Sequence, residues 1–143
     1  MSGWNQQFQS PGIEDLLAEL SPEHRKAVAH VRDWVGEHLS DRPVLTYYHA
    51  SWGWAEQYQP EADDLTGVYL IPQPGLPRIA ICCGRTFFEE HRISEMPKHI
   101  QAAVRAGVCV GRFVWVECPA TTEAEAAAVC EFLTLMNSSA QDV

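Results

Sequence analysis

The segment from Val44 to Cys83 most constrains the fold of this chain, because short apolar runs alternate in it with turn residues. Its sequence is VLTYYHASWGWAEQYQPEADDLTGVYLIPQPGLPRIAICC, and it contains six of the nine Trp and Tyr residues. The turn residues divide the segment into four predicted strands, at about 44–50, 53–59, 66–71 and 77–83. Consecutive strands joined in this way form an antiparallel meander.

Helical patterns precede and follow the meander. The periodicity predicts helices over 13–20 and 22–39, then 87–91, 94–106 and 122–136, with a fifth strand over 112–118. A run of strands between helices predicts an α+β fold, with one antiparallel sheet of about five strands and helices mainly on one face. We expect a single domain over residues 1–143, with 1–10 as a loose arm and 138–143 as a frayed tail.

Two features of the apolar residues lead to predictions about the interior. Val129, Phe132, Leu133 and Met136 recur at helical spacing, so we expect this stripe to pack against the sheet. The five cysteines are odd in number and lie in apolar surroundings, which predicts buried free thiols.

Charge and hydropathy exclude several classes of partner. The formal net charge of −9 argues against binding to a nucleic-acid backbone, and there is no Lys/Arg cluster that would override it. No apolar run approaches the roughly 18 residues of a membrane span. The polar N-terminal residues lack a signal pattern, so a cytoplasmic location is expected.

The candidate site is the face of the sheet that the helices leave open. Side chains alternate along a strand, so Tyr47 and His49 share one face of their strand, as do Trp54, Glu56 and Tyr58 of the next. The same alternation gives Val114, Val116 and Cys118 to the helix side of the fifth strand, and Trp115 and Glu117 to the open side. If these sets share the open face with Tyr69, they form an aromatic pocket that also bears Glu and His.

The residue types suggest acid/base chemistry. Burial beside aromatic rings disfavours a charged carboxylate, a setting that enzymes use for a general acid or base. We therefore assign candidate catalytic roles to Glu56, His49 and Tyr58. The candidate ligand-binding residues are Tyr47, Trp54, Tyr69, Trp115 and Glu117. No metal-ligand spacing and no glycine-rich phosphate loop occurs, so no metal or cofactor is expected. The alternative is that these aromatic residues are ordinary half-exposed sheet residues or a homodimer interface.

Several short motifs resemble those of a known protein group. These are Gly53-Trp54 before a strand with Tyr58, Leu70 and Gly75, the run R-I-A-I-x-x-G ending at Gly84, and M-P-x-x-I-x-x-A with Pro97, Ile100 and Ala103. In these the chain, from about Trp34 to its last helix, resembles small bacterial proteins of a domain-of-unknown-function family related to the YdhG-like superfamily. The resemblance implies an α+β fold and supplies no catalytic residue. Members of the wider superfamily look similar to frataxin-like iron chaperones, which bind iron on acidic surfaces.

Two functional hypotheses follow. The first is a small-molecule-binding protein whose pocket takes an aromatic or hydrophobic metabolite, either as a cofactor-free cyclase, isomerase or hydrolase or as a resistance protein that sequesters the compound. The second is an acidic metal-handling or protein-interaction module. Measuring whether the protein binds a panel of aromatic ligands or instead iron or calcium would separate the two hypotheses.

Overall fold

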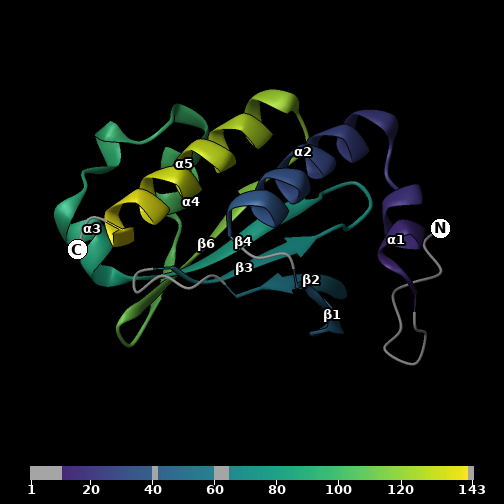
Figure 1. Ribbon diagram of the computed structural model, residues 1–143, viewed down its shortest axis with the longest axis horizontal. Helices are drawn as coiled ribbons and strands as arrows, with labels where there is room; N and C mark the ends of the chain where they lie inside the picture. Colours follow the sequence, from purple (N-terminus) through teal and green to yellow (C-terminus); the bar gives the residue numbers. More distant parts are fainter. Residues whose placement is uncertain (1–10, 40–41, 60–64, 142–143) are drawn as a thin grey trace.

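A six-stranded antiparallel sheet lies beneath a layer of helices in the computed structural model, which describes residues 11–39, 42–59 and 65–141 (Figure 1). The strands are β1 (Val44–Tyr47), β2 (Trp54–Tyr58), β3 (Leu65–Ile71), β4 (Arg78–Gly84), β5 (Val108–Val110) and β6 (Phe113–Pro119). Their order across the sheet is β1-β2-β3-β4-β6-β5. The predicted α+β class and the four-strand meander are therefore confirmed.

The sixth strand, β5, is the difference from the prediction. It pairs with β6 so that Val110 lies opposite Phe113, leaving Gly111 and Arg112 as a two-residue hairpin loop. Gly111 has φ of 61°, a conformation that glycine adopts without steric cost and that such tight hairpins require. A strand of three exposed residues has too short an apolar pattern to be recognised before the turn.

Helices cover one face of the sheet (Figure 1). They are α1 (Ile13–Ala18), α2 (Pro22–His38), α3 (Arg85–Glu90), the 3₁₀ turn η1 (Ile93–Glu95), α4 (Lys98–Arg105) and α5 (Glu123–Gln141). The start of α2 follows from its sequence, because Ser21 caps it with a hydrogen bond from the His24 amide and Pro22 takes the first position. The long helices α2 and α5 lie side by side over the strands.

The main core lies between these helices and the sheet. The predicted stripe on α5 is confirmed, since Val129, Phe132, Leu133 and Met136 are all fully buried. It belongs to the same buried cluster as residues of β3, β4 and β6, including Ile81. Burying such side chains is the largest favourable contribution to folding.

The cysteine prediction is correct for bonding but wrong for burial at one position. All five cysteines are free; Cys82, Cys83, Cys118 and Cys130 are buried, whereas Cys109 is exposed. The reason is that Cys109 lies on β5, the edge strand whose three residues are all exposed. Burial raises the pKa of the Cys118 thiol to about 12 and that of Cys130 to about 11.

Several boundaries differ from the predictions. Helix α5 continues to Gln141, through most of the tail that was expected to fray. The expected helix over 94–106 divides into η1 and α4, which begins only after Pro97. The predicted arm at 1–10 and hairpin loop at 60–64 lie outside the described residues. Within the part of the chain that the structure describes, no helix is long and apolar enough to cross a membrane.

Candidate functional site

Strand pairing places the predicted site residues on both faces of the sheet. Glu56 lies opposite Leu70, which belongs to the core beneath the helices. Trp54 and Tyr58 share the parity of Glu56 and so project toward the helices. Tyr47 lies opposite Trp54, and their rings meet edge to face at 5.8 Å between centroids. The predicted residues are therefore divided between the two faces of the sheet, and the prediction that they share one open-face pocket is wrong.

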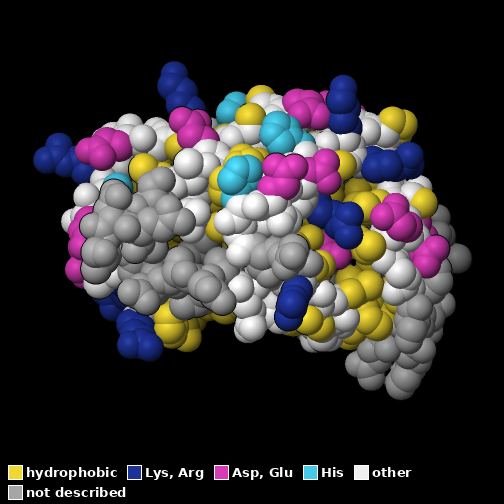
Figure 2. Space-filling model, viewed as in Figure 1, with side chains coloured by type: hydrophobic (Ala, Val, Ile, Leu, Met, Phe, Trp, Pro, Cys, Tyr) yellow, Lys and Arg dark blue, Asp and Glu magenta, His cyan; other side chains and the backbone are white. Residues whose placement is uncertain are grey.

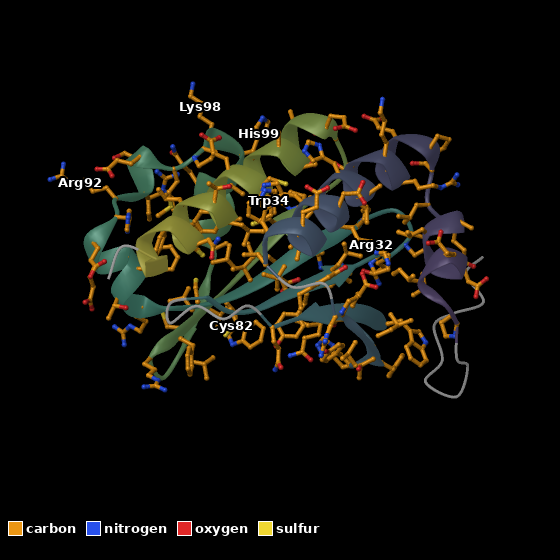
Figure 3. The ribbon with its side chains drawn as sticks, viewed as in Figure 1. Arg32, Trp34, Cys82, Arg92, Lys98 and His99 are labelled. Atoms are coloured by element: carbon orange, nitrogen blue, oxygen red, sulfur yellow. The ribbon has the colours of Figure 1, made fainter. Side chains whose placement is uncertain are left out.

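The helix-side residues form a buried ion pair with a tyrosine. Arg32 of α2 donates from Nε to Glu56 Oε1 at 2.9 Å and from Nη2 to Oε2 at 3.4 Å. The Tyr58 hydroxyl donates to the same Oε1 in a short hydrogen bond. Glu56 is 3% exposed, and among the described residues it is the one charged residue that is buried. Figure 3 shows Arg32 reaching from α2 toward the strands.

This trio is electrostatically satisfied. Burial, followed by the hydrogen bond and charge of Glu56, raises the pKa of Tyr58 well above its ordinary value. The hydrogen bond to Glu56 raises the pKa of Arg32. The arrangement keeps Tyr58 protonated and Arg32 charged at neutral pH. Such a closed network explains how a Glu is tolerated among apolar residues, and it gives Glu56 a structural role beside the catalytic one that was predicted.

The open face instead carries an aromatic hollow of about 330 Å³, lined by Tyr48, His49, Trp52, Tyr69 and Trp115. The rings touch in a connected cluster. Trp52 lies 5.4 Å from Tyr69 and 6.2 Å from Trp115 between centroids, and Tyr69 lies 5.4 Å from Trp115. Tyr48 and His49 complete the cluster, with centroids 5.4 and 5.2 Å from that of Trp52, and Tyr48 also meets Tyr69 at 5.6 Å.

The connection between β1 and β2 brings Tyr48 and Trp52 over this face. Strand β1 ends at Tyr47, so residues 48–53 form a loop rather than the strand ends that were predicted. Gly53 has φ of 69°, and its carbonyl accepts from the Tyr48 amide at 3.0 Å. Because His49 lies in this loop, strand parity does not apply to it. That is why His49 reaches the hollow while Tyr47 does not.

Small side chains beneath the rings make room for them. Ala55 and Ala80, together with the larger Ile71, are fully buried where Tyr48, Trp52 and Tyr69 pack against them. The Tyr69 ring also lies over Gly67, where an added Cβ would be 2.9 Å from Tyr69 Cε1. A larger residue at these positions would push the rings away from the sheet.

Gln57 fixes the two tyrosine rings. Tyr48 donates to Gln57 Oε1 at 3.1 Å, and Gln57 Nε2 donates to the Tyr69 hydroxyl at 3.3 Å. Burial is the main cause that raises the pKa of both tyrosines. Both hydroxyls are thus neutral, oriented hydrogen-bonding groups at neutral pH. Nearby on the same face lies Cys82, below the sheet in Figure 3.

Glu117 lies on the open face as predicted, but it is paired. Arg78 donates from Nε to Glu117 Oε1 at 2.7 Å and from Nη2 to the Ser51 carbonyl at 2.9 Å. Arg78 thereby connects β6 to the loop that carries Trp52. Sequence parity could not identify Tyr48, Trp52, Gln57 or Arg78, because their placement depends on where β1 ends and on which strands are neighbours.

No group of three or more His, Cys, Asp and Glu residues is placed to hold a metal ion within residues 11–39, 42–59 and 65–141. Figure 2 shows acidic and histidine side chains over the helices on one face, with hydrophobic side chains at the lower right in the region of β1 and β2.

Comparisons with known proteins identify no relative: no protein-family model, no curated protein and no solved structure matches the chain. The functional argument therefore rests on the geometry of the site.

Proposed function

We propose that this protein binds a planar, largely apolar small molecule in the aromatic hollow. The observation that carries the proposal is the set of five ring side chains that line one depression of about 330 Å³. That volume lies near the lower end of the range for small-molecule sites, which are mostly apolar with few polar groups. A flat ligand stacked on Trp52 or Trp115 would have His49 as a polar neighbour.

Binding rather than catalysis is the function that this geometry favours. Glu56 and Tyr58, the strongest acid/base candidates, project from the opposite side of the sheet from Trp115. His49 is the titratable imidazole that lines the hollow. A protein that holds an aromatic metabolite there would act as a carrier or as a sequestering resistance protein.

The test compares two tryptophans of the same hairpin. Trp52 lines the hollow, whereas Trp54 projects toward the helices. Binding of 2-naphthol, with cyclohexanol as a non-planar comparison, is measured by calorimetry for the wild type, Trp52→Leu and Trp54→Leu. An aromatic contact contributes about 0.5–1.5 kcal/mol beyond buried area. We therefore expect Trp52→Leu to weaken 2-naphthol binding about tenfold and Trp54→Leu to change it less than about twofold.

Two results would overturn the proposal. One is 2-naphthol binding no tighter than cyclohexanol in the wild type. The other is an equal loss in the two variants, which would mean that the hollow is not the site. Light scattering of the free protein adds a check, because a dimer that excludes 2-naphthol and dissociates on Trp52→Leu would make this face an interface between copies.

A further inference from the structure

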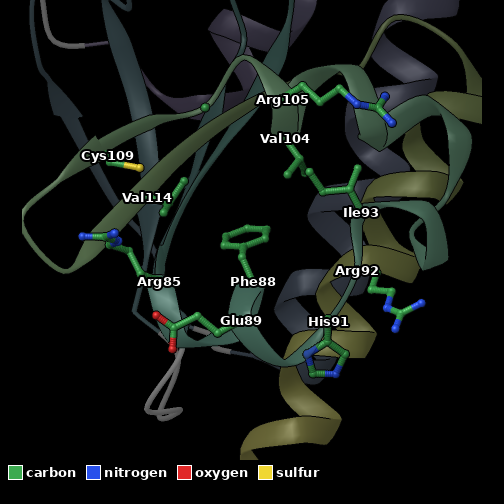
Figure 4. Close-up of a pocket in the computed structure, with 11 residues that line it drawn as sticks. Arg85, Phe88, Glu89, His91, Arg92, Ile93, Val104, Arg105, Cys109 and Val114 are labelled. Carbon is green, nitrogen blue, oxygen red and sulfur yellow. The ribbon is translucent and has the colours of Figure 1, made fainter.

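A second and larger cavity, of about 570 Å³, lies at the end of the molecule formed by α3, η1, α4 and the β5–β6 hairpin (Figure 4). It shares no lining residue with the aromatic hollow. Val114 lines this cavity and the next residue, Trp115, lines the hollow. Since consecutive residues of a strand project to opposite faces, the two cavities lie on opposite sides of β6.

The interior of this cavity is apolar. Phe88, Ile93, Val104 and Val114 line it, and the Phe88 ring stands in the middle of the lining residues in Figure 4. Phe88 is half-buried and packs edge to face on the fully buried Phe87, with centroids 5.2 Å apart. The floor of the cavity is therefore anchored in the main core.

Three arginines surround the opening. Arg85 lies on the side of the β5–β6 hairpin, and Arg92 and Arg105 lie on the side of η1 and α4, with their guanidinium groups directed outward (Figure 4). All three are exposed, so rotation of these long side chains can bring a guanidinium over the opening. Within the described residues none of the three forms an ion pair with a carboxylate.

The remaining contacts of these arginines are long. Arg85 donates to the Gly111 carbonyl at 3.4 Å, and Arg105 donates to Gln101 Oε1 at 3.5 Å. Both distances exceed the usual N–H···O range, so most guanidinium donors remain available. His91 is held against the helix, because its Nδ1 lies 3.1 Å from the Phe87 carbonyl and its ring stacks on Phe87.

The charge around this cavity differs from that of the whole chain. Residues 85–112 contain five of the ten Lys and Arg residues but only three of the nineteen Asp and Glu residues, in a chain of net charge −9. One of those acids, Glu89, lines the cavity. Its charge would oppose a doubly charged phosphate more strongly than a singly charged carboxylate. An apolar interior with arginines at its edge suits a ligand that has both an apolar body and one carboxylate.

We infer that this cavity, bounded by Arg85, Arg92 and Arg105, is a second binding site, for a small apolar carboxylate such as an aryl-alkanoic or short-chain acid. The apolar body lies on Phe88 and Val104, and the carboxylate meets an arginine at the edge. The site is independent of the aromatic hollow and of the ligand proposed for it.

Cys109 supplies a reporter for this site, because it lines the cavity and is exposed while the other four cysteines are buried. The probe is 4-phenylbutyrate, compared with 4-phenylbutanol, which lacks the charge, and with inorganic phosphate, which lacks the apolar body. The rate of reaction of Cys109 with a thiol reagent is measured in native protein against the concentration of each probe. We expect saturating 4-phenylbutyrate to slow this reaction at least about fivefold, with half-protection below about 1 mM.

The variants test the charge and the location. The double variant Arg85→Gln/Arg105→Gln should raise the concentration for half-protection about tenfold. A control that removes the same charge outside the cavity, Lys26→Gln/Lys98→Gln, should change it less than about twofold; Lys98 stands on the outer side of α4 in Figure 3. Trp52→Leu should leave protection unchanged, which keeps this test separate from that of the hollow.

Any of four outcomes would overturn the inference. These are no protection of Cys109 by 4-phenylbutyrate up to about 10 mM, equal protection by 4-phenylbutanol, equal protection by phosphate alone, and equal losses in the two double variants. Circular dichroism of each variant confirms that the fold is retained before the rates are compared. All four substituted cavity and control positions are exposed, so the substitutions should not affect the core.

Discussion

The buried pair of Arg32 and Glu56 should stabilise the fold in an asymmetric way. The Glu56 side chain is 4% exposed, whereas the Arg32 side chain is 29% exposed. Removing Arg32 leaves an almost fully buried carboxylate with Tyr58 as its remaining side-chain donor among the described residues. Removing the charge of Glu56 leaves a guanidinium that still reaches solvent. The arginine variant should therefore be the less stable of the two.

The magnitudes follow from these environments. Breaking a buried ion pair so that one charge is left unpaired costs about 3–5 kcal/mol, which we expect for Arg32→Met. Glu56→Gln keeps an acceptor for Tyr58 and loses charge-assisted hydrogen bonding, which costs about 1–2 kcal/mol. The double variant Arg32→Met/Glu56→Leu replaces the pair with apolar side chains and should return to within about 1 kcal/mol of the wild type.

Urea unfolding at pH 7, followed by circular dichroism, measures these free energies, with unchanged m-values as the condition for comparing them. With the single variant Glu56→Leu measured as well, the double-mutant cycle isolates the coupling between the two positions, which should exceed about 2 kcal/mol. The reasoning is refuted if Arg32→Met costs no more than Glu56→Gln. It is refuted equally if the double variant is no more stable than Arg32→Met.

Three further predictions concern stability. Phe132 is fully buried, so Phe132→Ala should cost about 3–5 kcal/mol in urea melts, and a loss below about 1 kcal/mol would contradict its place in the core. Burial raises the pKa of Cys118 from 9.0 to about 12, so the stability that its neutral thiol contributes is present below pH 9 and is lost as pH rises toward 12. Cys118→Ala should flatten this alkaline decline of stability in thermal melts, whereas the control Cys109→Ala should not. Burial acts to raise the pKa of Glu125, but hydrogen bonds from Thr121 outweigh it and lower the pKa. The stability that Glu125 contributes is therefore lost as pH falls below the ordinary carboxylate range. Glu125→Gln should reduce this acid sensitivity in thermal melts, and an unchanged acid sensitivity would show that the Thr121 hydrogen bonds do not form.

Periodicity within single elements was enough to predict most of the fold. The α5 stripe is fixed by local spacing, and the inward positions Val114, Val116 and Cys118 of β6 are all buried as the alternation predicted. These predictions need no knowledge of neighbouring elements. The same local pattern could not reveal β5, because three exposed residues on an edge strand leave no apolar period.

The candidate site was harder to predict because it depends on the phase between strands. Parity correctly joined Trp54, Glu56 and Tyr58 on one face, but it could not say that this face meets the helices. The partner that settles the question is Arg32, which reaches Glu56 from α2, more than twenty positions earlier in the chain. The ion pair with this helix residue stabilises Glu56 in its inward position, and the sequence of the strand alone does not reveal the partner.

The open face had a sequence signal of a different kind. Ala55 and Ala80 and, on β3, Gly67 are small residues on neighbouring strands, and in the structure large rings cover them. Small side chains on a sheet face that no helix covers would leave backbone near water, unless rings from elsewhere lie across them. Tyr48 and Trp52 come from a loop, so their rings are positioned by Gly53 and by the Arg78 contact to Ser51 rather than by strand alternation. Small residues on adjacent strands beside an aromatic loop therefore predict this hollow better than the parity of the aromatic residues does.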